Sequence, residues 1–309
     1  MIELRLSILD ILSTKKTGHK LIMLTAYDST MARIIDGMGI DIILVGDSAG
    51  NIMLGYENTI PVTMDDMIRF TAAVVRSTNK SFIIGDMPFM SYEVSAEEAT
   101  RNAGRFIKEG GAMAVKLEGG SEMKTQISAI IDSGIPVCGH LGLTPQSIHK
   151  FGGFKVQART AGAARSLIED SLALQKAGIF LLVLEGIPWQ VAKLVTECVS
   201  IPTIGIGAGP FCDGQVMVTQ DILGLFDGFK PKFVKHFGKI REHIEEALSK
   251  YKQEVLEGAF PLFEHSYEMP KEEMDRLLEE NPSYTFFYDP EPEVARSLPK
   301  RVADAKNGR

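Results

Sequence analysis

Short apolar runs alternate with longer segments of helical spacing along the first two hundred residues, and no other feature of the sequence constrains the fold as strongly. The runs have the length of strands and are rich in Ile, Val and Leu, which is typical of strands buried on both faces. They occupy residues 21–24, 41–45, 82–85, 113–117, 135–138, 180–184 and 203–205. We therefore predict at least seven strands in one sheet.

Segments with a helical pattern lie between consecutive runs, at residues 29–38, 64–77, 96–109, 122–132, 161–177 and 189–199. A strict strand–helix order predicts parallel strands, because each helix carries the chain back to where the next strand begins. The last repeat is degraded, and we place a short helix near 218–223 and an eighth strand near 232–234. The 309 residues suit one (β/α)₈ barrel with additions, or two average domains.

The C-terminal part of the sequence departs from this alternation. Residues 239–257 predict one more helix, and after Ser266 the composition shifts to prolines without a strand pattern, apart from a possible short helix at 271–280. We therefore divide the chain into a catalytic barrel, residues 1–266, and a C-terminal extension, residues 267–309. The aromatic residues at 284–288 could dock on the barrel or on another subunit, or could belong to an extended surface tail.

Charge and cysteine content exclude several classes of partner. The formal net charge of −7 argues against a nucleic-acid-binding protein and against binding to an anionic membrane surface. No apolar run approaches the roughly 18 residues of a membrane-spanning helix. The three cysteines are far apart and form no CxxC pair, so we expect reduced thiols in the cytoplasm. The first residues lack the pattern of a secretory signal.

Polar residues follow the predicted strands at the points where these strands end. They are Asp47, Asp86, Lys116, Glu118, His140 and Glu185, and the glycine-rich segment 205–209 follows the seventh run. The carboxyl ends of the strands in a parallel barrel meet at one face, which is where the active sites of such barrels lie. A single polar residue at a strand end is more often a cap or a loop contact, but six of them converge on one mouth.

Two of these residues suggest a metal. Asp47 and Asp86 supply hard oxygen ligands, and no His or Cys pair at metal-binding spacing lies nearby, so the pair suits Mg²⁺ better than Zn²⁺. Glu118 could be a third ligand or could hold metal-bound water.

The other three residues suggest acid–base chemistry. Lys116 could bind a substrate carboxylate or a developing oxyanion. His140 is an alternative oxyanion partner, and a core histidine bonded to the backbone is an equally good interpretation. Glu185 follows a strongly apolar strand, where a partly desolvated carboxylate is an effective general base. The set predicts proton abstraction beside the carbonyl of a small 2-oxo acid, with the enolate held on a metal.

Longer strings then identify a family. The chain resembles the 3-methyl-2-oxobutanoate hydroxymethyltransferase (ketopantoate hydroxymethyltransferase) family from about residue 3 to residue 266. The matching strings are LTAYD (24–28), VGDS (45–48), GYENTIPVT (55–63), GDMPFMSY (85–92), VKLEGG (115–120), CGHLGLTPQS (138–147), FGGFKVQAR (151–159), LVLEGIP (182–188), IGIGAG (204–209) and PKFVKHF (231–237).

The resemblance implies a (β/α)₈ TIM barrel of the phosphoenolpyruvate mutase/isocitrate lyase type, assembled as a homodecamer. It also implies a Mg²⁺-dependent transferase of pantothenate and coenzyme A biosynthesis. Such an enzyme moves a hydroxymethyl group from 5,10-methylenetetrahydrofolate to 3-methyl-2-oxobutanoate and gives 2-dehydropantoate. The folate co-substrate follows from the resemblance alone.

Residue roles carry over by motif. Asp47 and Asp86 match the Mg²⁺ ligands, and Glu118 matches the residue that binds the metal through water. Ser48 and Lys116 match residues that contact the keto acid, and Glu185 matches the general base. His140 matches a residue of the substrate pocket.

This chain departs from the family pattern in two places, and two other functions are alternatives to the transferase. Ala49 and Asn51 stand where many relatives have larger apolar residues, and the family usually ends near the string at 263–267, which leaves the tail unexplained. A C–C bond lyase of the same superfamily would use a similar set of acids and bases. A catalytically silent scaffold barrel would have no reason to keep Asp47, Asp86, Lys116 and Glu185.

Overall fold

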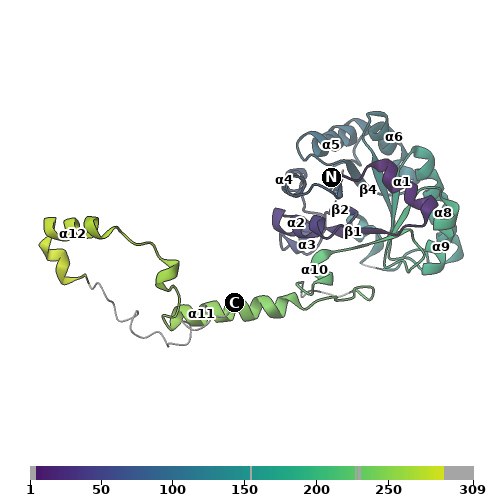
Figure 1. Cartoon of the computed structure of the whole chain (residues 1–309). Helices are drawn as coiled ribbons and strands as arrows, with labels where there is room; N and C mark the ends of the chain where they lie inside the picture. Colours follow the sequence, from purple (N-terminus) through teal and green to yellow (C-terminus); the bar gives the residue numbers. More distant parts are fainter. Residues whose placement is uncertain (1–4, 154, 227, 229–230, 289–309) are drawn as a thin grey trace. The chain divides into compact units, whose positions relative to one another are not determined.

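A computed structural model describes residues 5–153, 155–226, 228 and 231–288. Eight parallel strands form a closed barrel in sequence order, and β8 pairs with β1 (Figure 1). The strands are β1 (Leu21–Thr25), β2 (Ile42–Val45), β3 (Phe82–Asp86), β4 (Ala114–Glu118), β5 (Val137–Gly142), β6 (Leu181–Glu185), β7 (Thr203–Ile206) and β8 (Gly214–Met217). The predicted (β/α)₈ barrel is confirmed.

Helices surround the barrel, and six of them match the predicted segments (Figure 1). These six are α2 (Ser29–Gly37), α4 (Met64–Val75), α5 (Ala96–Lys108), α6 (Lys124–Asp132), α8 (Ala161–Ala177) and α9 (Trp189–Cys198). The first unit also contains an N-terminal helix, α1 (Ile8–Thr17), and five shorter helical elements. These are α3 (Ala49–Ile52), η1 (Ser121–Met123), η2 (Pro145–Ser147), α7 (Ile148–Phe151) and α10 (Thr219–Ile222). Local signals begin several of them: Ser7 and Thr63 form capping boxes at α1 and α4.

Each strand presents alternate residues to two different environments, because side chains along a strand point to opposite faces. One face packs against the helices in the larger apolar cluster, as Ile83 and Leu117 do. The other face fills the barrel interior in a second apolar cluster that includes Phe82, Ile84 and Ala114. Continuing the interior face by two residues from Ile84 leads to Asp86. The period of two therefore points the polar residues at the strand ends into the barrel.

The register then sets these polar residues side by side. Asp86 of β3 lies opposite Lys116 of β4, and Glu118 of β4 lies opposite His140 of β5. Glu185 of β6 lies opposite Gly142 of β5. Neighbouring strands are about 4.8 Å apart, so the register places Asp86 within reach of Lys116 and Glu118 within reach of His140.

The eighth strand is not where we predicted it. Residues 232–234 form a turn, and β8 is instead Gly214–Met217, which follows β7 without an intervening α-helix. Its outward residue Gln215 is exposed, so this strand is not a continuous apolar run and carries a weak sequence signal. The short helix predicted near 218–223 is α10, which follows β8 rather than preceding it.

The chain divides into two compact units, Met1–Lys239 and Ile240–Arg309. The second unit contains α11 (Ile240–Leu256), η3 (Phe263–His265), α12 (Lys271–Glu280) and η4 (Pro282–Phe286), so both predicted C-terminal helices form. The rings of Phe286 and Phe287 contact each other edge to face at 5.4 Å. The boundary at residue 266 and the docking of the aromatic cluster stay predictions. Within the described residues, no helix is both long and apolar enough to cross a membrane.

Candidate active site

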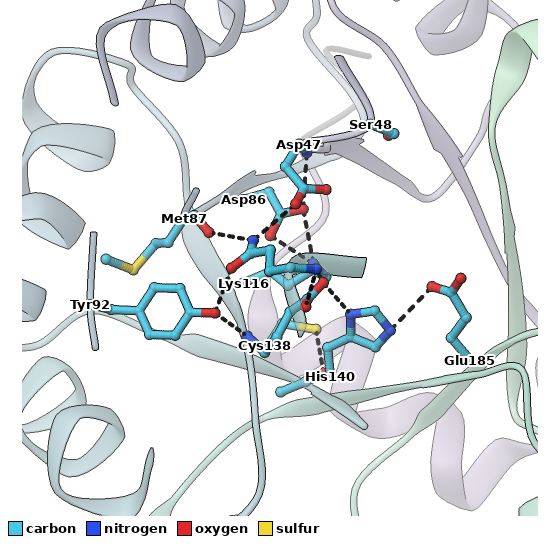
Figure 2. A network of polar contacts seen from close by, with 12 residues as sticks. Asp47, Ser48, Asp86, Met87, Tyr92, Lys116, Cys138, His140 and Glu185 are labelled. Atoms are coloured by element: carbon cyan, nitrogen blue, oxygen red, sulfur yellow. Dashed lines mark hydrogen bonds and ion pairs between the residues drawn. The ribbon is translucent and has the colours of Figure 1, made fainter. Parts of the chain in front are cut away.

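A cavity of about 720 Å³ opens at the carboxyl ends of the strands. It lies within the first unit, and all seven predicted site residues line it: Asp47, Ser48, Asp86, Lys116, Glu118, His140 and Glu185. We call the six residues other than Ser48 the mouth cluster, because hydrogen bonds and ion pairs connect them in one network (Figure 2).

Asp47, Asp86 and Lys116 form one side of the mouth cluster. The Lys116 ammonium donates to both carboxylate oxygens of Asp86, at 2.7 and 2.9 Å, and both side chains are almost fully buried (Figure 2). Asp47 follows β2, and its backbone N–H donates to Oδ2 of Asp86 at 3.1 Å. The two acids proposed as metal ligands are thus brought together, with a fixed cation beside them.

Glu118 and His140 link that side to the general base. Glu118 Oε1 lies 3.6 Å from Lys116 Nζ and 3.2 Å from His140 Nδ1. His140 Nε2 lies 3.3 Å from Glu185 Oε2 (Figure 2). These two contacts of His140 are ion pairs, and neither ring nitrogen meets the geometric criteria for a hydrogen bond. His140 is therefore a bridge between two carboxylates, and its interpretation as a core histidine bonded to the backbone is wrong.

Glu185 is held by the end of β6, while its side chain keeps 16% of its surface exposed to the cavity. The Glu185 carbonyl accepts the N–H of Leu143 at 2.8 Å. Gly142, with a φ of +99°, allows this approach, because a Cβ at residue 142 would lie 2.2 Å from the Glu185 carbonyl oxygen. The turn after β5 thereby fixes the backbone that carries the predicted base.

Ser48 stands apart from the mouth cluster, although it lines the same cavity (Figure 2). Its hydroxyl pairs with that of Tyr27 at 2.8 Å. Of the two departures from the family pattern, Asn51 lines the cavity and donates to the Tyr56 carbonyl, whereas Ala49 is buried in the helix-packed core. Asn51 is thus the one that can alter the edge of the pocket.

Burial and neighbouring charges shift the pKa values of several side chains in the mouth cluster. Burial, together with the charge of Asp86, raises the pKa of Asp47 to about 8. Burial would lower the pKa of Lys116, but the surrounding carboxylates outweigh it and raise that pKa, so the ammonium stays charged. Burial would also lower the pKa of His140, yet its pKa rises to about 9 because Glu118 and Glu185 favour the imidazolium.

The donors fit a hydrated hard cation. With all its carboxyl groups ionised, the mouth cluster holds four negative charges against one ammonium and one imidazolium. A divalent ion would balance this excess and favour the ionised forms of Asp47 and Asp86, whose pKa values are raised without it. Within the described ranges, no three His, Cys, Asp or Glu side chains form a ready metal cage. Mg²⁺ ordinarily binds through one or two carboxylates and keeps several waters, so a complete protein cage is not needed.

Sequence reasoning did not find two residues of this network. The Gln146 side chain donates from Nε2 to Asp47 Oδ2 and to the Met87 carbonyl, both at 2.9 Å. Tyr92 donates its hydroxyl hydrogen to Gln146 Oε1 at 2.7 Å and accepts the N–H of Glu118 (Figure 2). Gln146 lies in the short helix η2 and Tyr92 in the loop before α5. Neither segment has a periodic pattern, so only their place inside two specific strings could have drawn attention to them.

Comparisons with known proteins identify the family of the chain. The family model described as "Ketopantoate hydroxymethyltransferase" matches residues 5–262. A 3-methyl-2-oxobutanoate hydroxymethyltransferase from Syntrophomonas wolfei is 56% identical over 263 residues, covering 85% of this chain and 95% of the relative. One from Thermoanaerobacter sp. (strain X514) is 54% identical, covering 88% of this chain and 99% of the relative.

A solved structure supports the type of fold. The crystal structure of 2,3-dimethylmalate lyase, described as a member of the PEP mutase/isocitrate lyase superfamily, superposes with a TM-score of 0.55. It covers 91% of this chain and 97% of the lyase, at 14% sequence identity. At that identity the likeness concerns the fold, which is the predicted barrel type.

Proposed function

Because the chain belongs to the ketopantoate hydroxymethyltransferase family, we propose that it transfers a hydroxymethyl group from 5,10-methylenetetrahydrofolate to 3-methyl-2-oxobutanoate. The product is 2-dehydropantoate, a precursor of pantothenate and coenzyme A. The observation that carries the proposal is the unbroken line of contacts from Asp47 through Asp86, Lys116, Glu118 and His140 to Glu185. Such a line can hold a cation at one end and accept a proton at the other.

Asp47 and Asp86 hold Mg²⁺ in this proposal, and Glu118 binds it through water. The ion, when bound, polarises the keto acid and so makes its C3–H more acidic. Lys116 and Ser48 contact the keto acid, with the Lys116 ammonium placed for its negative charge. The ammonium is already fixed by Asp86, so little reorganisation is needed as charge develops on the keto oxygen.

Glu185 takes the proton from C3 of the keto acid. Its partial exposure to the cavity leaves it accessible to substrate, and His140 holds one of its oxygens from the side. The buried, charged His140 also keeps Glu185 and Glu118 at a defined separation. The C3 carbon, once deprotonated, forms the new C–C bond to the methylene carbon of the donor. Both C–N bonds of that carbon break, so tetrahydrofolate leaves, and one water supplies the oxygen of the new hydroxymethyl group. Family membership decides against the superfamily lyase reaction, which would start from the same cluster.

One assay tests the whole proposal. The purified chain should form 2-dehydropantoate only with both the keto acid and the folate donor, and only with Mg²⁺. Without folate it should still exchange the C3 hydrogen of 3-methyl-2-oxobutanoate for deuterium, which NMR detects. Product from the keto acid without folate, or no exchange in a folded sample, would contradict the proposal.

Assembly and location remain separate proposals. We propose a homodecamer in the cytoplasm, in keeping with the family resemblance and with the free thiols of Cys138, Cys198 and Cys212. Truncation after Ser266 should lower the melting temperature or the mass found by light scattering, while deuterium exchange continues. Lost exchange at unchanged mass would instead place the extension in the active site.

A further inference from the structure

Gln146 is the residue outside the predicted set that touches the mouth cluster most extensively. It lies in η2, just after β5, and is 4% exposed. Its side chain donates to Asp47, and its backbone N–H donates to Glu118 Oε2 at 3.1 Å. One residue thus holds a carboxylate from each of two strand ends that are not neighbours, β2 and β4.

The orientation of the Gln146 amide is fixed by its surroundings. The Met87 carbonyl can only accept, so Nε2 must face Met87 and Asp47. Tyr92 accepts the N–H of Glu118, which leaves its own hydroxyl hydrogen for Gln146 Oε1. Both amide hydrogens and the amide oxygen of Gln146 are therefore used, and the amide cannot flip without losing three hydrogen bonds.

We propose that Gln146 is a positioning residue for the metal-holding carboxylates, with Tyr92 as the residue that locks its amide. The inference rests on the proposed function, because it concerns the acids assigned there to Mg²⁺. Gln146 occupies one oxygen of Asp47 and one of Glu118, and so determines which oxygens remain for the ion and its water. Outer partners of metal ligands affect metal affinity and activity by about 10- to 100-fold.

Two variants separate positioning from simple packing. Gln146→Met keeps similar bulk and the backbone bond to Glu118 but removes every side-chain donor. Tyr92→Phe keeps the ring and removes only the hydroxyl. The matched control is Gln175→Met in α8, where the two lost hydrogen bonds hold Ser200 before β7, at the opposite end of the barrel.

Mg²⁺ alone is the probe, titrated calorimetrically into each substrate-free protein. The Kd for Mg²⁺ should rise about 10- to 100-fold in Gln146→Met, by a smaller factor in Tyr92→Phe, and not in Gln175→Met. At limiting Mg²⁺, kcat for deuterium exchange should fall in the same order and recover at high Mg²⁺, while the KM for the keto acid at saturating Mg²⁺ stays near that of the wild type.

The outcomes that overturn the inference differ from those that overturn the proposed function. If the wild type binds Mg²⁺ and both site variants bind it with the same Kd, Gln146 is a packing residue. A change in melting temperature alone would not alter that conclusion. Absence of Mg²⁺ binding and exchange in the wild type itself would remove the metal assignment and this inference together. Because Tyr92→Phe changes a single atom, it keeps the test valid if Gln146→Met does not fold.

Discussion

The two ends of the barrel interior are built by the same strands and have opposite chemistry. At the amino end, Ile11 of α1 packs with Leu21, Phe82 and Phe180 in an apolar cluster. At the carboxyl end, the interior face carries the mouth cluster, whose side chains are ionisable and, apart from that of Glu185, buried. The structure therefore separates stability from chemistry along the barrel axis rather than between domains.

Strand β4 shows how abruptly the change occurs. Ala114 belongs to the apolar interior, Lys116 follows two residues later on the same face, and Glu118 follows two residues after that. The outward residues Val115 and Leu117 stay apolar throughout and hold the strand against the helices. A strand anchored in this way can bear two buried charges, because the cost of their burial is offset by packing elsewhere.

The largest expected effect is at the base. Glu185→Gln keeps the shape of the side chain but cannot accept a proton, so C3 deuterium exchange should fall by about 10²- to 10⁴-fold. Exchange is followed by NMR at saturating keto acid, with keto acid binding measured separately by calorimetry. Binding should persist, and the melting temperature should fall only by what the ion pair with His140 contributes, since Glu185 is not part of the apolar packing. Wild-type exchange in this variant would transfer the role of base, with His140 as the next residue to test.

The opposite end of the barrel should respond in the opposite way. Ile11→Ala removes a fully buried side chain from the apolar cluster, and such truncations cost about 2–5 kcal/mol of unfolding free energy. Denaturant unfolding measures this loss, while kcat at a temperature where the variant is folded should stay at the wild-type value. Leu9→Ala is the matched control, because it lies in the same helix with its side chain 72% exposed. A large loss of kcat in folded Ile11→Ala would mean that the two ends are coupled.

The contrast between the apolar and the polar end of the barrel also explains how much of the fold and of the site could be predicted from the sequence. Strands with continuous apolar runs were predictable because both of their faces are buried, and the polar residue that ends each run marks the mouth. The period of two then explains why Asp86, Lys116 and Glu185 point inward.

What the sequence did not reveal depends on contacts between distant segments. Strand β8 alternates between buried and exposed residues and lacks a preceding helix, so neither run length nor chain order identifies it. Gln146 meets Asp47 only because β2 and the loop after β5 converge at one mouth, 99 positions apart in the chain. The role of such a residue is a property of the closed barrel, and no local pattern encodes it.

A smaller effect should show that the mouth cluster costs stability. The raised pKa of Asp47, about 8, means that its ionised form is disfavoured in the folded protein. Between about pH 4 and pH 8 the unfolded chain releases this proton more readily, so wild-type stability falls as pH rises. Asp47→Asn removes that contribution. With EDTA present, it should melt a few degrees above the wild type at pH 8, since about 1 kcal/mol shifts Tm by roughly 2–4 °C at this size.

Mg²⁺ provides the complementary measurement for this variant. It should raise the wild-type melting temperature and not that of Asp47→Asn, because a ligand stabilises only the protein that binds it. Exposed Asp132→Asn is the control and should leave both curves in place. A variant less stable than the wild type at every pH would show that Asp47 contributes to the fold as well as to the chemistry.

The smallest effect concerns the charge state of His140. Its pKa is raised to about 9 from an ordinary 6.5, because Glu118 and Glu185 favour the imidazolium more than burial opposes it. The stability that it contributes is therefore fully present below pH 6.5 and is lost as pH rises through 9.

An NMR titration of the imidazole resonances with EDTA present should give a midpoint near 9, with the signal assigned by its absence in His140→Gln. Glu185→Gln should lower this midpoint because one of the two carboxylates that face the ring becomes neutral, whereas Glu197→Gln on the surface of α9 should not. A wild-type midpoint below 6.5 would mean that burial prevails at the mouth, and that His140 meets the substrate as a neutral ring.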